Sequence, residues 1–173
     1  KLFKNALDQV ELADQLGVDF AWMVEHHFLE EYSHCPAPEI FLGAASQRTK
    51  DIRLGHGIIQ LTTNHPARVA ERVATLDLIS GGRVEFGMGE GGSLTELGPF
   101  DRKIEEKREV WEDAVRAVMP MFADGGFEYD GPHFKFPLRN VLPKPAQKPH
   151  PPLWVACSQL QTIEYAGRRG MGA

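Results

Sequence analysis

The sequence predicts an α/β protein built on a parallel sheet. Short apolar runs alternate with amphipathic helical patterns four times along the 173 residues, which is the order of elements in parallel sheets with helical crossovers. The predicted strands are apolar throughout, as expected where both faces of a sheet are covered. Polar residues and glycines follow each run, and the carboxyl ends of parallel strands are where ligand sites form.

The individual elements follow from residue types and spacing. Four runs rich in aromatic or β-branched side chains predict the strands: 19–24, 52–60, 83–88 and 153–157. Five segments with apolar residues at helical spacing predict the helices: 2–17, 38–49, 66–80, 102–123 and 158–170. Pro38 and Pro66 suit first helical turns. Gly17 and Gly81 suit helix C-termini, and Ser158 is the expected N-cap of the last helix.

Two segments lie outside this alternation. Residues 89–102 are rich in glycine and predict a mobile loop over the strand ends. Residues 127–152 begin with aromatics around Asp130–Gly131, a turn signal that predicts a small β-hairpin, and continue as an extended proline-rich run.

Composition excludes several classes of partner. The formal net charge is -5 and no basic run is present, so nucleic-acid and anionic-membrane partners are not expected. No apolar stretch approaches the ~20 residues of a membrane span, and no signal peptide opens the chain. Cys35 and Cys157 lie far apart in unlike contexts, which favours free thiols and a cytoplasmic location.

Polar side chains gather at the four predicted strand ends: Glu25 to His27, Thr62 to His65, Gly89 to Ser93, and Cys157 with Ser158. Neighbouring parallel strands bring such groups to one edge of a sheet, so the segment Glu25-His26-His27 is a candidate site. His65 precedes a helix-starting proline, so a structural role is expected for it. Cys157 is expected to be a small apolar filler rather than a nucleophile.

Three stretches together resemble the luciferase-like flavin monooxygenase family: WMVEHHF, RLGHGIIQLTTNHPARVAERVATLDLISGGRVEFGMGEG and PLWVACSQLQTIEYAGRRG. The most specific part is HPxRxAExVxxLDxxSxGR followed by a strand that ends in glycines. The family fold is a TIM (β/α)8 barrel, which needs about 250 residues. Residues 1–173 hold about four strand–helix units, so we interpret them as a single domain that is part of such a barrel, a fragment without its first strand and last three units.

The resemblance implies a catalytic residue and a flavin-binding wall. His26 matches the family's active-site histidine, which can transfer protons near neutral pH. His27 is expected to pack or to orient its neighbour, and Glu25 to anchor one of the two imidazoles. The bond Gly57–Ile58 matches a non-prolyl cis peptide that supports the flavin ring in many members. The simpler alternatives are that His26 only ends a strand and that Gly57 only permits close packing.

The resemblance also implies phosphate contacts, with one departure. Ser158 matches a phosphate ligand, and Thr162 is a weaker candidate; Ser158 could instead be only an N-cap. Gly89 and Glu90 stand where luciferase has a reactive thiol and a phosphate-binding arginine. A carboxylate at position 90 would repel phosphate unless it points elsewhere or other donors compensate.

The resemblance therefore implies a flavin-dependent monooxygenase or oxidoreductase that uses reduced FMN and O2 on a small organic substrate. A separate flavin reductase would supply the FMN, and a deazaflavin coenzyme is an alternative. A homodimer or larger oligomer is expected, with helices 38–49 and 66–80 as the candidate contact. Two rival functions stay open at this point. One is a metal-dependent barrel hydrolase or isomerase with ligands among His26, His27, His34 and Cys35. The other is a flavin-binding homologue without catalytic activity.

Overall fold

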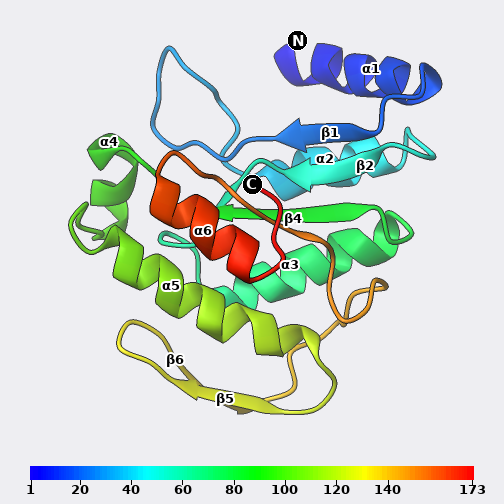
Figure 1. Ribbon diagram of the computed structural model, residues 1–173. Helices are drawn as coiled ribbons and strands as arrows, with labels where there is room; N and C mark the ends of the chain where they lie inside the picture. Colours follow the sequence, from blue (N-terminus) through cyan, green and yellow to red (C-terminus); the bar gives the residue numbers. More distant parts are fainter.

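A computed structural model describes residues 1–173, and its main sheet is parallel and ordered along the chain (Figure 1). Strand β1 (Phe20–Met23) pairs with β2 (Arg53–His56), β2 with β4 (Val84–Gly89), and β4 with β7 (Leu153–Val155). The short strand β3 (Ile59–Gln60) follows β2 and also pairs with β4. The predicted arc of four adjacent parallel strands is confirmed.

The second predicted strand is interrupted. Residues 52–60 form β2 and β3 rather than one strand, and the peptide bond between them, Gly57–Ile58, is cis. This is the bond at which the resemblance placed a cis peptide, so that expectation is confirmed.

Five helices lie against one side of the sheet: α1 (Leu2–Gln15), α2 (Pro38–Ser46), α3 (Pro66–Ile79), α5 (Lys107–Val118) and α6 (Leu160–Arg168). The short helix α4 (Leu94–Leu97) lies in the segment that follows β4. Helix α1 packs on α2, α2 on α3, and α3 on α5, while α6 lies near β7 (Figure 1). Pro38 and Pro66 occupy first helical turns, as predicted. Gly17 and Gly81 follow α1 and α3 with positive φ, which glycine adopts at low cost. None of the helices is long and apolar enough to cross a membrane.

The predicted helix 102–123 is shorter than expected at both ends. Helix α5 begins at Lys107, because Arg102 is held to the preceding loops: its backbone N–H donates to Leu97 O (3.1 Å) and its side chain to Thr62 O (2.8 Å). At the other end the chain continues as a 3-10 turn over Met119–Phe122. Pro120 has no N–H for the α-helical bond, and 3-10 turns are common where an α-helix ends.

The glycine-rich segment 89–102, predicted as a mobile loop over the strand ends, contains regular structure. It contains α4 and a 3-10 turn, and Ser93 Oγ accepts the first-turn N–H of Thr95 (3.2 Å). Glu96 and Leu97 are buried, so two side chains fix the segment to the rest of the protein. The sequence signal was present, because Ser-x-x-Glu at 93–96 is a helix-start signature.

The predicted hairpin is confirmed as β5 (Phe127–Asp130) paired antiparallel with β6 (Lys135–Arg139), and it lies beside α5 (Figure 1). Asp113, fully buried on α5, accepts hydrogen bonds from the backbone N–H groups of His133 (2.9 Å) and Phe134 (3.1 Å) and from the Tyr129 hydroxyl. These bonds hold the pKa of Asp113 below its usual range although burial acts in the opposite direction.

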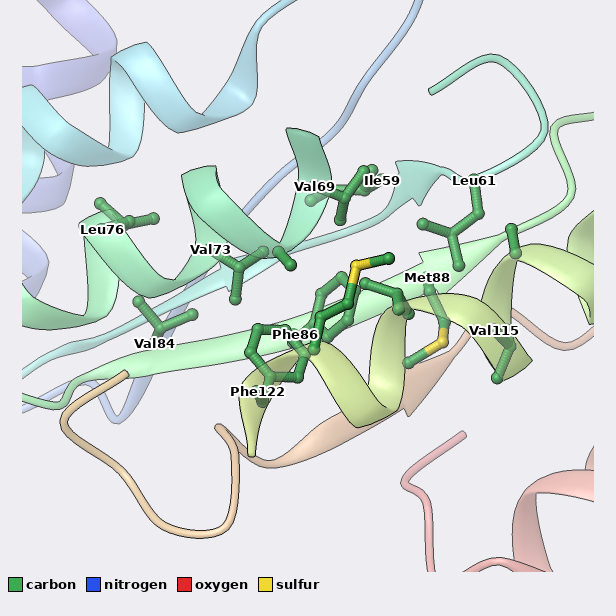
Figure 2. Packing of buried hydrophobic residues seen from close by; sticks show 14 of the residues in the cluster. Ile59, Leu61, Val69, Val73, Leu76, Val84, Phe86, Met88, Val115 and Phe122 are labelled. Atoms are coloured by element: carbon green, nitrogen blue, oxygen red, sulfur yellow. The ribbon is translucent and has the colours of Figure 1, made fainter. Parts of the chain in front are cut away.

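The hydrophobic core fills the space between the sheet and helices α3 and α5, as Figure 2 shows with side chains from both layers: Val69, Val73, Leu76, Val84, Phe86, Met88, Val115 and Phe122. Strand β4 is buried along its whole length, which fits its central place in the sheet. His56 is fully buried against this core, and burial lowers its pKa to about 4. Its Nε2 atom has no hydrogen-bond partner.

Candidate active site

A cavity of about 540 Å³ opens at the carboxyl ends of the strands, within the size range of small-molecule sites. All seven predicted site residues line it: His26, Gly57, Ile58, Gly89, Glu90, Ser158 and Thr162. The cavity also includes groups that sequence reasoning did not single out, above all Gln60, Glu96 and Lys107.

His26 lies in the loop after β1, on the cavity side. Its backbone N–H donates to Cys35 O (2.9 Å), which closes that loop, and its Nδ1 lies 3.0 Å from Glu96 Oε1. Tyr32 packs edge-on against its ring, with centroids 5.3 Å apart. The imidazole is therefore oriented by groups from two different loops.

His27 turns away from the cavity and contacts a different carboxylate. Its Nε2 lies 2.8 Å from Glu25 Oε1, and its ring packs edge-on against Phe100 with centroids 5.1 Å apart. Glu25 is buried and also accepts hydrogen bonds from Gln60 N–H (3.0 Å) and the Asn64 amide (2.9 Å). Glu25 therefore anchors one of the imidazoles, as expected, and that imidazole is His27.

Glu96 is the main residue that sequence reasoning missed. Its Oε1 atom accepts hydrogen bonds from the backbone N–H of His27 (3.0 Å) and the side-chain amide of Gln60 (2.9 Å), in addition to the contact with His26. Burial alone would raise the pKa of Glu96, but these hydrogen bonds hold it below its ordinary value. A carboxylate is thus maintained directly behind His26.

Glycine backbone forms one wall of the cavity. A β-carbon on Gly89 would lie 2.9 Å from Ile58 Cδ1, so only glycine allows Ile58 to cover this position. Gly91 has a φ of +71°, and a β-carbon there would lie 2.8 Å from Gln60 Oε1. The wall from Gly57 to Gly91 therefore offers backbone and one aliphatic side chain, a surface that a flat ring can approach closely.

Two cations flank Glu90, the residue that departs from the luciferase pattern. Arg108 Nη1 lies 2.9 Å from Glu90 Oε1 and Lys107 Nζ 3.6 Å from Oε2. Arg108 also donates to Thr162 Oγ1 (3.1 Å). Arg108 also pairs with Glu112 (2.7 Å), so the two cations offset part of the repulsion that the sequence suggested for Glu90. Both cations lie at the start of α5, where sequence reasoning considered only the apolar stripe.

The predicted N-cap role of Ser158 is wrong. Helix α6 begins at Leu160, and its N-cap is Gln159, whose carbonyl accepts from Thr162 N–H (3.0 Å) and Ile163 N–H (3.2 Å). Ser158 precedes the helix because Gln159 is still extended, and Ser158 contributes to the cavity lining instead.

The remaining polar candidates have structural positions. His65 Nδ1 accepts from Ala67 N–H (3.2 Å) and so caps α3, as expected. Cys157 and Cys35 are free thiols, and burial raises the pKa of both, so neither is a poised thiolate. No group of three or more His, Cys, Asp or Glu side chains is arranged to hold a metal ion.

Comparisons with known proteins identify the family of this chain. The model of the family of luciferase-like monooxygenases matches residues 2–173. The oxygenase component of a flavin-dependent trigonelline monooxygenase from Acinetobacter baylyi is 28% identical, with 98% of this chain and 47% of the relative covered. An F420-dependent glucose-6-phosphate dehydrogenase from Amycolatopsis mediterranei is also 28% identical, over 98% of this chain and 52% of the relative.

A solved structure gives the same result at the level of fold. The monooxygenase RslO1 from Streptomyces bottropensis superposes with a TM-score of 0.93 and 34% identity, covering 98% of this chain and 52% of RslO1. The chain spans about half the length of the relatives that it matches. The four-stranded arc is thus part of a (β/α)8 barrel, and the chain belongs to the luciferase-like monooxygenase family.

Proposed function

We propose that the full-length protein is a flavin-dependent monooxygenase that uses reduced FMN and O2 on a small organic substrate. The observation that carries the proposal is the division of one cavity into a backbone wall around the cis bond Gly57–Ile58, a cationic end at Lys107, and a carboxylate-backed imidazole at His26. This combination suits an isoalloxazine ring, a phosphate and proton transfer, respectively.

The residues present fit FMN. The ring would lie against Gly57, Ile58 and Gly89, where a β-carbon on Gly89 would collide with the wall. The phosphate would lie toward Lys107, with the hydroxyls of Ser158 and Thr162 at the same end of the cavity. Bound reduced flavin would supply electrons to O2.

This chain's own residues then have distinct roles. Lys107 attracts the dianion, and Arg108 holds both Glu90 and the Thr162 hydroxyl in place. His26 moves a proton at the ring nitrogen that does not face Glu96. The loops after β1 and β4 meet where the His27 ring packs against Phe100.

Flavin titration of the full-length protein tests the cofactor. Lys107→Gln should weaken FMN binding by about tenfold, a loss of about 1.4 kcal/mol, because the cavity loses its lining cation. Riboflavin, which has no phosphate, should bind about equally to the wild type and the variant. Lys103→Gln is the matched control, because Lys103 is 74% exposed and pairs only with Glu106. Glu90→Gln should tighten FMN, since it removes the negative charge beside the phosphate.

Two results would contradict the proposal in different ways. Unchanged FMN affinity in Lys107→Gln would mean that the phosphate lies elsewhere. Tight binding of F420 with negligible binding of FMN would identify a deazaflavin enzyme, an alternative that rests on the similarity to the F420-dependent dehydrogenase. Bound FMN without any oxygen-dependent reaction would leave a flavin-binding homologue.

Two partner expectations remain proposals. We propose a separate flavin reductase as the source of reduced FMN, by analogy with the relative that is named as an oxygenase component. We also expect a homodimer through α2 and α3, where Ile40 is 73% and Ile79 is 51% exposed. Apolar side chains exposed on neighbouring helices are typical of interfaces.

A further inference from the structure

The two adjacent histidines are anchored through opposite ring nitrogens. His26 faces a carboxylate with Nδ1, and His27 faces another carboxylate with Nε2. A neutral imidazole carries one N–H and one bare nitrogen, so the nitrogen that faces an obligatory acceptor must carry the proton. The question is then whether each carboxylate oxygen is truly an acceptor.

The surrounding donors settle this question for Glu96. Its Oε1 atom receives the backbone N–H of His27 and the amide N–H of Gln60, and neither of these groups can accept a hydrogen bond. The orientation of the Gln60 amide is fixed because its nitrogen also donates to Glu25 O (3.1 Å). A flipped amide would place its oxygen against two acceptors. Glu96 Oε1 is therefore an acceptor, and His26 Nδ1 donates to it.

The same reasoning applies to Glu25. Its Oε1 atom receives the Asn64 amide (2.9 Å), and its Oε2 atom the backbone N–H of Gln60 (3.0 Å). Asn64 is itself oriented, because Arg72 donates to its amide oxygen (2.6 Å). The proton of neutral His27 therefore lies on Nε2.

We propose that Glu96 is a positioning residue that fixes His26 as the Nδ1–H tautomer and so directs a bare Nε2 into the cavity, while Glu25 fixes His27 as the opposite tautomer. His26 lines the cavity, and its Nε2 has no hydrogen-bond partner in the protein. In this role Glu96 acts through His26, whose Nδ1 lies 3.0 Å from its Oε1. The catalytic consequence rests on the proposed function, whereas the tautomers do not.

The consequence for the proposed reaction concerns a single proton. Neutral His26 accepts a proton at Nε2 from an O–H or N–H group in the cavity, and the lone pair of Nε2 forms the new N–H bond. The positive charge of the resulting imidazolium is offset by the Glu96 carboxylate, 3.0 Å from Nδ1. With the other tautomer, Nε2 would already carry a proton and could only donate.

Long-range proton–nitrogen NMR of the full-length protein labelled with ¹⁵N-histidine tests the inference directly. Spectra are taken without flavin near pH 8, above the ordinary histidine pKa of about 6.5. His26→Gln and His27→Gln assign the two signals by their loss. We expect a protonated Nδ1 and a bare Nε2 in His26, and the reverse pattern in His27. A His26 that carries its proton on Nε2, or that averages between both tautomers, overturns the proposal.

Two matched variants test whether each carboxylate fixes the tautomer of its own histidine or only supports the fold. Glu96→Gln should convert the single tautomer of His26 into a mixture and leave the pattern of His27 as it is. Glu25→Gln should do the reverse. If Glu96→Gln does not fold, as judged by circular dichroism, the wild-type spectrum decides alone. A folded Glu96→Gln protein whose His26 keeps the wild-type tautomer contradicts the proposal.

The proposed effect of Glu96 on catalysis through His26 is tested separately, by the rate of the oxygen-dependent reaction. In the protein loaded with FMN, His26→Ala and Glu96→Gln should both slow the oxygen-dependent reaction of bound reduced flavin by tenfold or more, with FMN affinity changed by less than about threefold. The double variant should be no slower than His26→Ala, because Glu96 acts through His26. Additive losses would overturn the positioning role, and failure of FMN to bind would overturn only the proposed function.

Discussion

His56 and Glu96 are both buried titratable side chains, but their surroundings favour opposite charge states: the uncharged form of His56 and the charged form of Glu96. His56 ends strand β2, and its side chain is buried beside Phe86, where burial depresses its pKa to about 4 and its Nε2 has no partner. Glu96 lies at the rim of strand ends, where three donors hold its pKa below the ordinary value. Burial alone thus favours the neutral form, whereas burial among oriented donors preserves charge. The core therefore favours the uncharged form of His56, whereas the rim of strand ends favours the charged form of Glu96.

The largest expected effect comes from the packing side of this comparison. Phe86→Ala should lower the free energy of unfolding by about 3–5 kcal/mol, because Phe86 is fully buried and its removal leaves a cavity between β4 and the helices. Ile58→Ala shortens an aliphatic side chain at the rim, where the cavity already exposes it. Its cost should be less than half that of Phe86→Ala in urea denaturation. Equal losses of unfolding free energy in the two variants would mean that the core and the rim do not differ in how much packing contributes to stability.

The second effect is a pH dependence of stability that depends on His56. The unfolded chain binds a proton at His56 near pH 6.5, but the folded chain binds it only near pH 4. Lowering the pH through this window therefore favours unfolding, by up to about 3 kcal/mol. His56→Leu should lose this part of the acid dependence, as measured by urea midpoints at pH 7, 6, 5 and 4 relative to the wild type. Parallel curves for the two proteins would show that His56 does not titrate in this window.

The rim of the site was harder to predict from the sequence than the sheet. The strands and the helices α1, α2 and α3 followed from periodicity and end signals, which are local properties of the chain. Glu96 was missed because its role depends on His26 and His27, which lie about 70 residues earlier. Lys107 was missed because its ion pair with Glu90 forms only when the start of α5 and the residue after β4 come together in the fold.

Ser93 and Ser158 show how the same local signal can succeed or fail. Both precede short helices at the rim, and the sequence favoured Ser158 as a cap and left Ser93 in a loop. The structure reverses this assignment: Ser93 accepts the Thr95 N–H, whereas the N-cap position of α6 is Gln159, whose side chain makes no capping hydrogen bond. A helix cap requires extended backbone at the residue just before the first helical turn, and the later start of α6 removes Ser158 from that position.

This pair gives the smallest predicted effect and the most local one. Ser93→Ala should cost about 1 kcal/mol, because the first turn of α4 loses its cap and Thr95 N–H loses its partner. Ser158→Ala should change stability by less than about 0.5 kcal/mol, since that hydroxyl caps no helix. Amide hydrogen exchange gives the sharper comparison: Ser93→Ala should accelerate exchange in α4 and at His27, whose N–H is bonded to Glu96 on that helix. If exchange at His27 stays at the wild-type rate while α4 exchanges faster, Glu96 keeps its hydrogen bond to His27 even when α4 is destabilised. The orientation of Glu96 would then depend on Gln60 and the histidines rather than on the helix that carries it.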